Sequence, residues 1–225
     1  MRRDKTQIAL GAALLAALTA FWRWHSPRAK PLTKEEIDYY LEIISKLPLP
    51  GDEAGKLVAK FRLWAEADDG KPFYMLNMIR FYDELHRFPG APEFDGTPEE
   101  SNAYYEKCLT SLWLKNASYP VLGGAVQGQT QITTHPEDAP WSQAKFVRYP
   151  SRRKFLELLS HPTYGPLEPY KIMSMELDMT PVSGDIQVPD PRLVVGGGLL
   201  ALFLGVGWRR ARRRSGLGGV LRAPA

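Results

Sequence analysis

The chain has 225 residues, enough for one sizeable folded domain with additional segments. Its formal charge of +4 is unevenly distributed: residues 30–190 contain 17 Lys and Arg against 24 Asp and Glu, a net charge of −7, and the two ends contribute +11. A domain that binds nucleic acid needs a basic surface, so this acidic central region argues against a nucleic-acid partner.

The first apolar segment, residues 8–24, is longer than a typical signal-peptide core and slightly shorter than a comfortable membrane span. It follows three basic residues, and no A-x-A cleavage site is evident near its end. Phe21, Trp22 and Trp24 are typical of an aromatic anchor at a membrane interface. We therefore predict an uncleaved N-terminal membrane anchor over residues 1–30, and a removed signal peptide is the alternative.

Two helices are predicted in the next segment, residues 31–69, which we interpret as a helical extension before the main domain. Thr33 and Glu36 have the spacing of a capping box, and apolar residues follow at helical intervals. Asp52 is placed to cap the second helix, which carries an apolar stripe that includes Trp64. An aromatic stripe at this spacing is more typical of a protein core than of a cofactor site.

The stretch at residues 72–81, PFYMLNMIRF, predicts a buried strand bounded by turns. Alternation places two sets of side chains on opposite faces: Phe73, Met75, Asn77, Ile79 and Phe81 on one, and Tyr74, Leu76, Met78 and Arg80 on the other. Both sets are largely apolar, so both faces should be covered. Asn77 is the exception, because an amide within an apolar face must find hydrogen-bond partners.

The remaining elements of the domain follow in an alternating order. A capped helix is predicted from Thr97, and a strand over residues 119–134 contains Gly123 and Gly124 as a bulge or a close approach. A strand over residues 141–149 precedes a helix capped by Ser151. A short helical piece at residues 164–171 leads into a last strand at residues 172–181.

The C-terminal part contains a second apolar segment. After a linker at residues 183–192, residues 193–208 are apolar and rich in glycine, which favours a short membrane span over a water-soluble helix. A basic tail, residues 209–225, begins with a block of arginines and is expected in the cytoplasm. Two spans would then place both termini inside, with the central domain on the extracytoplasmic side of the cell membrane. A processed sorting tail is a minor alternative for this segment.

From residue 72 the predicted order is β-α-β-β-α-β, so the expected fold class is α+β, ferredoxin-like, with an antiparallel sheet. Both helices of that arrangement cover one face of the sheet. The other face stays open in a monomer, and such a face often closes on a second copy. We therefore predict a homodimer through the open face.

Several of these residues together carry a family resemblance. LNMIRF after a Gly-Lys-Pro turn, Tyr104 and Tyr105, Gly123 and Gly124, and then WSQAKFVRYPSRRKFLELLSHPTYGPL resemble the dimeric α/β-barrel superfamily. Within that superfamily the chain resembles the bacterial branch called domain of unknown function 1330, over about residues 70–182. The branch usually has an arginine or His-Arg after a short Pro-x-Tyr stretch, and this chain has Lys171 at the matching place. The resemblance therefore does not predict an anion-binding arginine in this chain.

A candidate ligand pocket follows from the alternation of the strands. If Leu76 and Met78 face the helices, Asn77 lies on the open face. The polar and aromatic side chains expected beside it are Trp141, Gln143, Lys145, Tyr149, Ser174 and Glu176. Amides, a lysine and a glutamate among aromatic rings suit a small organic ligand. The alternative is that these groups pair with each other across a dimer interface.

No cofactor and no metal are expected. The four histidines lack the spacing of a metal-binding pair, and no phosphate-binding glycine loop or dinucleotide motif is present. Three functional hypotheses remain. The first is a membrane-tethered module that binds a small ligand or acts as an accessory protein. The second, implied by the resemblance, is a cofactor-independent oxygenase or a haem-handling enzyme, and the third is a structural dimerisation module.

Overall fold

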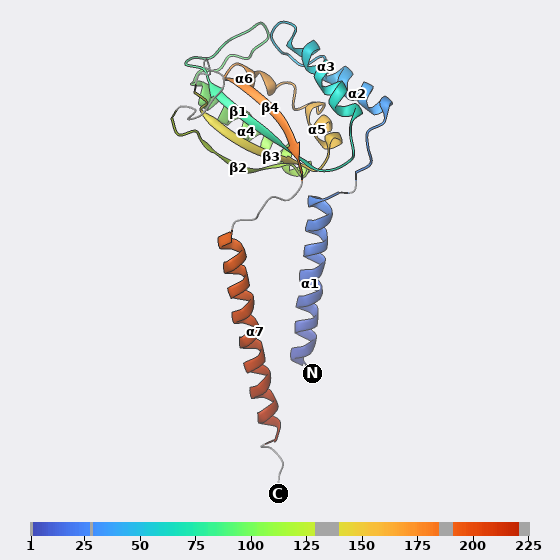
Figure 1. Ribbon diagram of the computed structural model, residues 1–225, viewed down its shortest axis with the longest axis vertical. Coiled ribbons are helices and arrows are strands. Elements are labelled where there is room, and N and C mark those ends of the chain that lie inside the picture. The colour runs from blue at the N-terminus through green and yellow to red at the C-terminus, as the bar shows by residue number, and fades with distance from the viewer. Residues whose placement is uncertain (1, 28, 129–139, 185–190, 221–225) are drawn as a thin grey trace. The chain divides into compact units, whose positions relative to one another are not determined.

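The computed structural model describes residues 2–27, 29–128, 140–184 and 191–220. The chain forms two units, residues 1–184 and residues 185–225. In chain order the elements are α1 (Arg2–His25), α2 (Lys34–Ile44), α3 (Glu53–Glu66), β1 (Phe73–Phe81), α4 (Pro98–Lys115), β2 (Tyr119–Ala125), β3 (Gln143–Tyr149), α5 (Arg152–Leu159), α6 (Glu168–Ile172), β4 (Met175–Ser183) and α7 (Pro191–Val220). Figure 1 shows them in this order along the chain.

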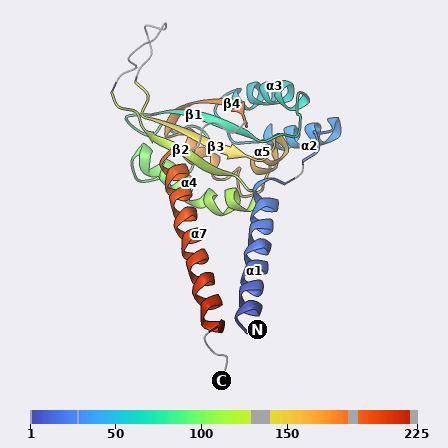
Figure 2. The ribbon, with the colours of Figure 1, turned by 60° about the horizontal axis from the view of Figure 1, so that its bottom comes forward.

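The four strands form one antiparallel sheet in the order β2-β3-β1-β4 (Figure 1, Figure 2). With α4 between β1 and β2, and α5 and α6 between β3 and β4, this is the predicted β-α-β-β-α-β arrangement. The expected α+β fold class is therefore confirmed at the level of the sheet and its connections.

Local sequence signals set the starts of three helices. Thr33 and Thr97 accept hydrogen bonds from the backbone N–H groups of Glu36 and Glu100, and both capping boxes are complete. Ser151 caps α5 by accepting from the Lys154 N–H. Asp52 precedes α3, but its side chain makes no capping hydrogen bond, so that predicted cap is wrong.

An aromatic cluster holds the helices on the sheet. The rings of Phe73 and Tyr149 stack across β1 and β3 at 5.3 Å, and the ring of Phe155 from α5 meets both of them edge-on. Trp64 of α3 packs edge-on against Phe73 at 5.0 Å and against Phe155 at 5.6 Å. The N-terminal helices are therefore part of the core, which buries Ile37, Leu41 and Ile44 of α2 as well.

These contacts correct the predicted facing of the strands. The face that carries Phe73, Met75, Asn77 and Ile79 packs against the helices, and we call it the helix-covered face. The opposite face, which we call the open face, carries Tyr74, Leu76, Met78 and Arg80. Because both faces of β1 are apolar, alternation alone could not tell which one the helices cover.

The same correction applies to β3. Asn77 pairs with Lys145, Ile79 with Gln143 and Phe73 with Tyr149, so these three partners lie on the helix-covered face and not on the open face as predicted. Glu176 pairs with Arg80 and belongs to the open face, as predicted.

The strand boundaries also differ from the prediction. β2 ends at Ala125, and most of the rest of the strand predicted to residue 134 lies outside the described residues. The register shift falls between Pro120 and Leu122, so the bulge is not at the glycine pair. Gly123 instead shows the close approach: a β carbon there would lie 3.0 Å from Cγ of Lys145. β4 begins at Met175, because residues 168–172 form α6.

The C-terminal end of α1 lies against one end of the open face. The ring of Trp24 stacks on Tyr119 at 5.9 Å, and its Nε1 donates to the Leu114 carbonyl at 2.9 Å. Tyr119 pairs with Arg148, whose side chain is buried beneath this contact.

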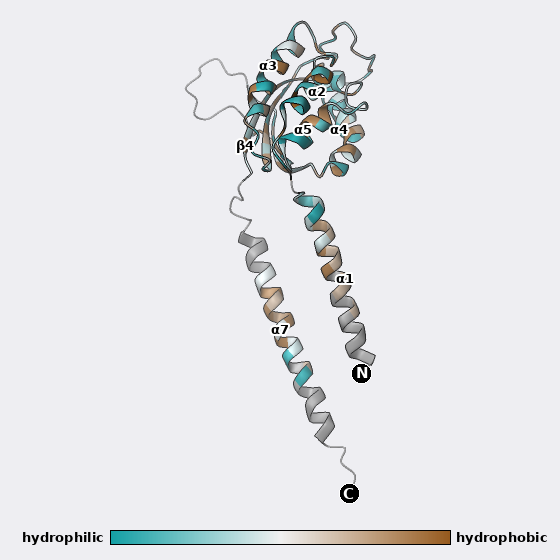
Figure 3. Ribbon diagram, turned by 90° about the vertical axis from the view of Figure 1, so that its right-hand side faces the viewer, coloured by the Kyte–Doolittle hydropathy of each residue, from teal (hydrophilic) through white to brown (hydrophobic). Residues whose placement is uncertain are grey.

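The two predicted membrane spans, residues 8–24 and 193–208, fall within α1 and α7. They are not supported, because in the part of the chain that the structure describes no helix is long and apolar enough to cross a membrane. Figure 3 shows hydrophobic residues along the middle of each helix.

Candidate functional site

A cavity of about 920 Å³ lies over the helix-covered face of the sheet. Its floor comes from β1, β3 and β4, and its walls come from α3, α4, α5 and α6. Apolar and aromatic lining residues include Met75, Ile79, Val147, Leu177 and Met179 from the strands, and Leu57, Phe61, Tyr105, Leu158 and Ile172 from the helices. Ligand pockets in proteins have volumes of roughly 300–1,000 Å³ and mainly apolar walls, so this cavity has the size and character of a small-molecule site.

The structure brings together five of the seven predicted site residues at this cavity: Asn77, Trp141, Lys145, Tyr149 and Glu176. Glu176, whose side chain belongs to the open face of the edge strand β4, reaches the cavity only at its rim. Gln143 instead lines a neighbouring hollow of about 580 Å³ beside β2. Ser174 is fully buried, and its hydroxyl donates to the Lys171 carbonyl at 2.7 Å. Part of the predicted set therefore lines one cavity, which is closed by helices of the same chain and not by the open face, and its role in ligand binding stays a prediction.

Asn77 lies on the floor of the cavity, and its amide group is held by the backbone. Nδ2 donates to the Met75 carbonyl at 2.9 Å and approaches the Lys145 carbonyl at 3.4 Å. These contacts supply the partners that a partly buried amide requires. They support a structural role for Asn77, whatever else contacts its side chain.

A polar chain crosses the cavity from the sheet to α4. Nζ of Lys145 lies 2.5 Å from Oε1 of Glu106, and Nδ2 of Asn102 donates to the same oxygen at 3.1 Å. The side chains of Lys145 and Glu106 are 24% and 34% exposed, so their pairing is partly shielded from water. The missing β carbon of Gly123 leaves room for the stem of Lys145 to reach this position.

A second charged pair lies at the start of α6. Glu168 is 5% exposed, and its Oε1 accepts a hydrogen bond from Nζ of Lys171 at 3.3 Å. Both residues line the cavity. Oε2 of Glu168 is also buried and has no hydrogen-bond partner within the described ranges.

The charge of Glu168 acts on three buried tyrosines, Tyr105, Tyr149 and Tyr164, and Tyr164 also has a side-chain hydrogen bond with Glu168. Burial raises the pKa of each hydroxyl above its usual value, and the negative charge of Glu168 raises it further. The hydroxyl oxygens of Tyr105 and Tyr164 lie 3.5 Å apart. These hydroxyls therefore stay protonated at neutral pH and can act as hydrogen-bond donors.

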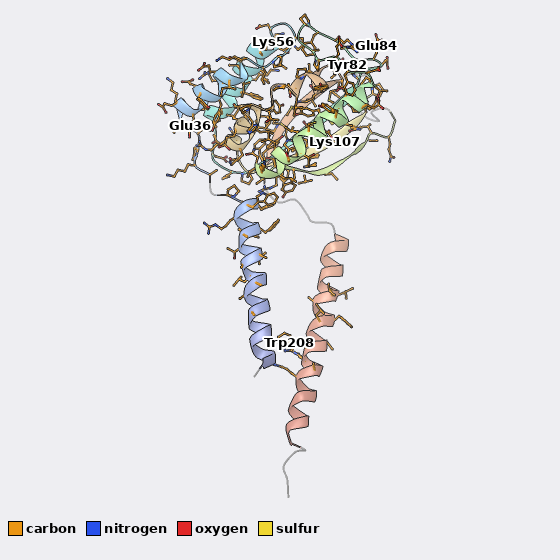
Figure 4. All side chains as sticks on the ribbon, turned by 180° about the vertical axis from the view of Figure 1, so that it is seen from behind. Glu36, Lys56, Tyr82, Glu84, Lys107 and Trp208 are labelled. Atoms are coloured by element: carbon orange, nitrogen blue, oxygen red, sulfur yellow. The ribbon has the colours of Figure 1, made fainter. Side chains whose placement is uncertain are left out.

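The more exposed lining residues form the rim of the cavity. Arg80 and Glu176 are ion-paired there, and the guanidinium of Arg80 lies 5.6 Å from the ring centre of Trp141. Lys56 and Tyr82, labelled in Figure 4, also belong to the lining. The whole lining contains five basic and five acidic residues, so the cavity carries no strong charge preference.

The sequence analysis did not identify three of the residues at the cavity, Asn102, Glu106 and Glu168, and it named Lys171 only as the residue at the position of the family's arginine. Glu106 lies one turn after Asn102 on a helix that also exposes charged residues, so its sequence context does not distinguish it. Glu168 directly precedes the Pro-Tyr-Lys stretch that matches a feature of the resembling family. This position in the sequence is the signal that could have identified Glu168 as a candidate. Across the residues with described positions, no group of three His, Cys, Asp or Glu side chains could hold a metal ion.

No protein-family model and no curated protein matches the chain. Two similar solved structures are of the RPA0582 protein of unknown function from Rhodopseudomonas palustris, a structural genomics target. The first is 20% identical with a TM-score of 0.48, and the match covers 59% of this chain and 94% of that chain. The methylated form is 20% identical with a TM-score of 0.49, and the match covers 60% of this chain and 93% of the other. The resemblance to the domain of unknown function 1330 therefore stays a prediction.

Proposed function

We propose that the domain is a binding module for a small organic molecule. The observation that carries this proposal is the cavity on the helix-covered face, where apolar walls surround a few convergent polar groups. The balanced charges of the lining favour a ligand without a large net charge.

A blocking variant on α3 tests this proposal. Leu57 is a half-buried lining residue, and Leu63 lies on the same helix with 74% of its surface exposed. A tryptophan at position 57 should fill part of the cavity, whereas a tryptophan at position 63 should point into solvent. Ligand-observed NMR with a library of small aromatic and aliphatic fragments should detect binders for wild type and Leu63→Trp, with weaker or absent binding for Leu57→Trp. A wild-type protein that binds no fragment, or equal binding by both variants, would contradict the proposal.

The second hypothesis, a haem-handling enzyme, can be distinguished from the binding module by an experiment on the same protein. A stoichiometric shift of the Soret band when haem is added would favour it over a module that binds other small molecules. Absence of the shift, together with fragment binding, would favour the binding module.

A dimerisation role is supported by a different surface, the open face. Leu76, Met78 and Phe146 are half-buried there, and Leu122 and Val182 are exposed by 66% and 40%. A contiguous apolar patch of this kind is typical of an interaction surface, and a second copy of the chain would present the same patch. We propose this face as the homodimer interface.

We also propose that α1 and α7 associate with a lipid bilayer, which does not require that either helix cross it. Exposed apolar side chains on α1 include Leu15, Leu18, Phe21 and Trp22, and those on α7 include Leu199, Leu200, Leu202, Phe203 and Leu204. Such side chains gain free energy when they leave water. The full chain should sediment with phosphatidylcholine–phosphatidylglycerol vesicles, and a chain with Leu18→Asp and Phe203→Asp should sediment less. A full chain that stays in the supernatant would overturn this proposal.

A further inference from the structure

The ion pair between Glu106 of α4 and Lys145 of β3 is shared by two hollows of the domain. Both residues line the cavity of about 920 Å³, and both also line the neighbouring hollow of about 580 Å³ beside β2. Their side chains remain 34% and 24% exposed although they are paired with each other. A molecule in either hollow can therefore contact this pair.

The ion pair leaves hydrogen-bonding capacity on both partners. Nζ of Lys145 and Nδ2 of Asn102 both donate to Oε1 of Glu106, at 2.5 Å and 3.1 Å. Within the described ranges, the side-chain atoms that are buried without a partner belong to other residues, so Oε2 of Glu106 is open to a further donor. An ammonium group has three donors, and Nζ uses one of them on Glu106. The pair therefore offers one acceptor and at least one donor to a third group.

The charges of the pair restrict what that third group can be. A ligand carboxylate would be attracted by Lys145 but repelled by Glu106, and a ligand ammonium would meet the reverse. Either charged group would also lose hydration in a site that is partly shielded from water. A neutral group avoids both costs, and it satisfies the pair if it donates to Oε2 of Glu106 and accepts from Nζ of Lys145.

Among neutral groups, an amide with its N–H and C=O on the same side matches this requirement best. Its donor and acceptor lie side by side on separate atoms, so it can serve a carboxylate and an ammonium at the same time. A ketone or an ester only accepts, and a hydroxyl must serve both partners from one oxygen. The apolar and aromatic lining near the pair, which includes Trp113 and Val147, suits a hydrocarbon or aromatic body for the ligand.

We propose that the Glu106–Lys145 pair binds the amide group of an uncharged carboxamide or lactam. The ligand N–H donates to Oε2 of Glu106, and the ligand carbonyl accepts from Nζ of Lys145. This inference rests on the proposed binding function, and it gives the pair a role in specificity besides joining α4 to the sheet.

Matched probes test this specificity. Benzamide and acetophenone differ only in an NH₂ group and the methyl group that replaces it, and NMR titration of the full chain gives both dissociation constants. Wild type should bind benzamide roughly five- to tenfold more tightly, because a site that accepts from an N–H discriminates against the analogue without it. Glu106→Gln should bring this ratio near one, because its amide keeps its oxygen on Lys145 and presents a donor in place of Oε2. Glu157→Gln is the control, since Glu157 is 33% exposed and pairs with a lysine outside the cavity lining, and it should leave the ratio unchanged.

Lys145→Met provides a second measurement that does not depend on the folding of Glu106→Gln. Both probes carry the carbonyl that accepts from Nζ, so both should bind roughly three- to tenfold more weakly to this variant, while benzamide stays the tighter of the two. Benzyl alcohol should bind wild type more weakly than benzamide does, because its hydroxyl has one oxygen for both partners.

Four results would overturn the role of this pair and leave the binding function standing. These are equal wild-type affinities for benzamide and acetophenone, an unchanged ratio in folded Glu106→Gln, undiminished affinity for both probes in Lys145→Met, and benzyl alcohol binding as tightly as benzamide. A wild type that binds library fragments but neither benzamide nor acetophenone would overturn it as well. A wild type that binds no fragment at all would instead overturn the binding function, and this inference with it.

Discussion

Lys145 of β3 and Glu106 of α4 form an ion pair, with 2.5 Å between Nζ and Oε1, across the cavity of the domain. The pair explains why a lysine lies on the face of the sheet that the helices cover. It also links the sheet to α4 within the lining of the cavity. Removing one partner leaves the other as a partly buried charge without its counter-ion.

A double-mutant cycle should therefore show coupling between these residues. Lys145→Met and Glu106→Gln should each lower the free energy of unfolding by roughly 1–2 kcal/mol. The double variant should lose less than the sum, with an interaction energy of at least about 0.5 kcal/mol. Urea unfolding of the four proteins measures this, and strictly additive losses would show that the pair does not couple β3 to α4.

Gly123 and Gly124 should respond differently to the same substitution. A β carbon at Gly123 would lie 3.0 Å from Cγ of Lys145 and 3.3 Å from the Ala144 carbonyl, whereas one at Gly124 meets nothing within 4 Å. Gly123→Ala should therefore lower the free energy of unfolding by roughly 1 kcal/mol or more through overpacking. Gly124→Ala should change it by less than about 0.5 kcal/mol. Thermal melts of both variants decide the matter, and equal effects would argue against the close approach.

Glu36 should make stability depend on pH in the acidic range. Hydrogen bonds from the Arg153 guanidinium and then from the Thr33 N–H lower the pKa of Glu36 to about 2 from its ordinary value of 4.5. Because the folded pKa is the lower one, the stabilisation is fully present above pH 4.5 and is lost as the pH falls towards 2. Since the side chain is 37% exposed, the effect should be modest, roughly 0.5–1 kcal/mol.

The measurement compares wild type with Glu36→Gln by urea unfolding at pH 6 and at pH 2.5. The difference in unfolding free energy should be present at pH 6 and shrink at pH 2.5, when wild-type Glu36 begins to protonate. Arg153→Met should show the same convergence, because it removes the main cause of the low pKa. A difference that does not change with pH would rule out this linkage.

The sequence predicted the elements of this domain better than their orientation. Thr33 with Glu36, and Thr97 with Glu100, predicted two helix starts because a capping box is a local interaction within four residues. The strands were predicted for a similar reason, since alternation and turn residues are local signals. Element ends were less accurate, as at Ala125, where β2 stops earlier than its composition suggested.

The facing of β1 could not be predicted, because it depends on contacts between distant segments. Phe73 faces the helices because Trp64 and Phe155 pack on it, and these rings come from α3 and α5. The cavity has the same origin: Lys145 and Glu106 are 39 residues apart and meet only once α4 lies on the sheet. Asn77 was identified as unusual from its apolar neighbours, but its hydrogen-bond partners are backbone carbonyls that no side-chain pattern reveals.

Dimerisation through the open face is tested by Leu122→Glu. Leu122 is 66% exposed on β2, so a charge there should not disturb folding but should oppose an apolar interface. Leu63→Glu on α3, where the leucine is 74% exposed, is the matched control outside the sheet. Light scattering at tens of micromolar should report a dimer for wild type and Leu63→Glu, and a monomer for Leu122→Glu. A monomeric wild type would exclude this interface at that concentration.

Asn77 allows the structural and the ligand-contact hypotheses to be compared directly. Its Nδ2 donates to the carbonyls of Met75 and Lys145, and its side chain also lines the cavity. Leucine has a similar volume but cannot donate, and aspartate has a similar shape but places acceptor oxygens beside two carbonyl oxygens. A structural role therefore predicts that stability decreases in the order Asn, Leu, Asp.

We expect Asn77→Leu to lower the free energy of unfolding by about 1 kcal/mol and Asn77→Asp to lower it by roughly 2–3 kcal/mol, because the latter adds an unpaired buried charge to the lost hydrogen bonds. Urea unfolding at pH 7 measures both, and fragment binding by the folded variants is measured in parallel. If Asn77→Leu is as stable as wild type but binds fragments more weakly, the backbone contacts contribute little and Asn77 acts on the ligand. If stability falls in the expected order while fragment affinity is unchanged, Asn77 supports the floor of the cavity by joining β1 to β3.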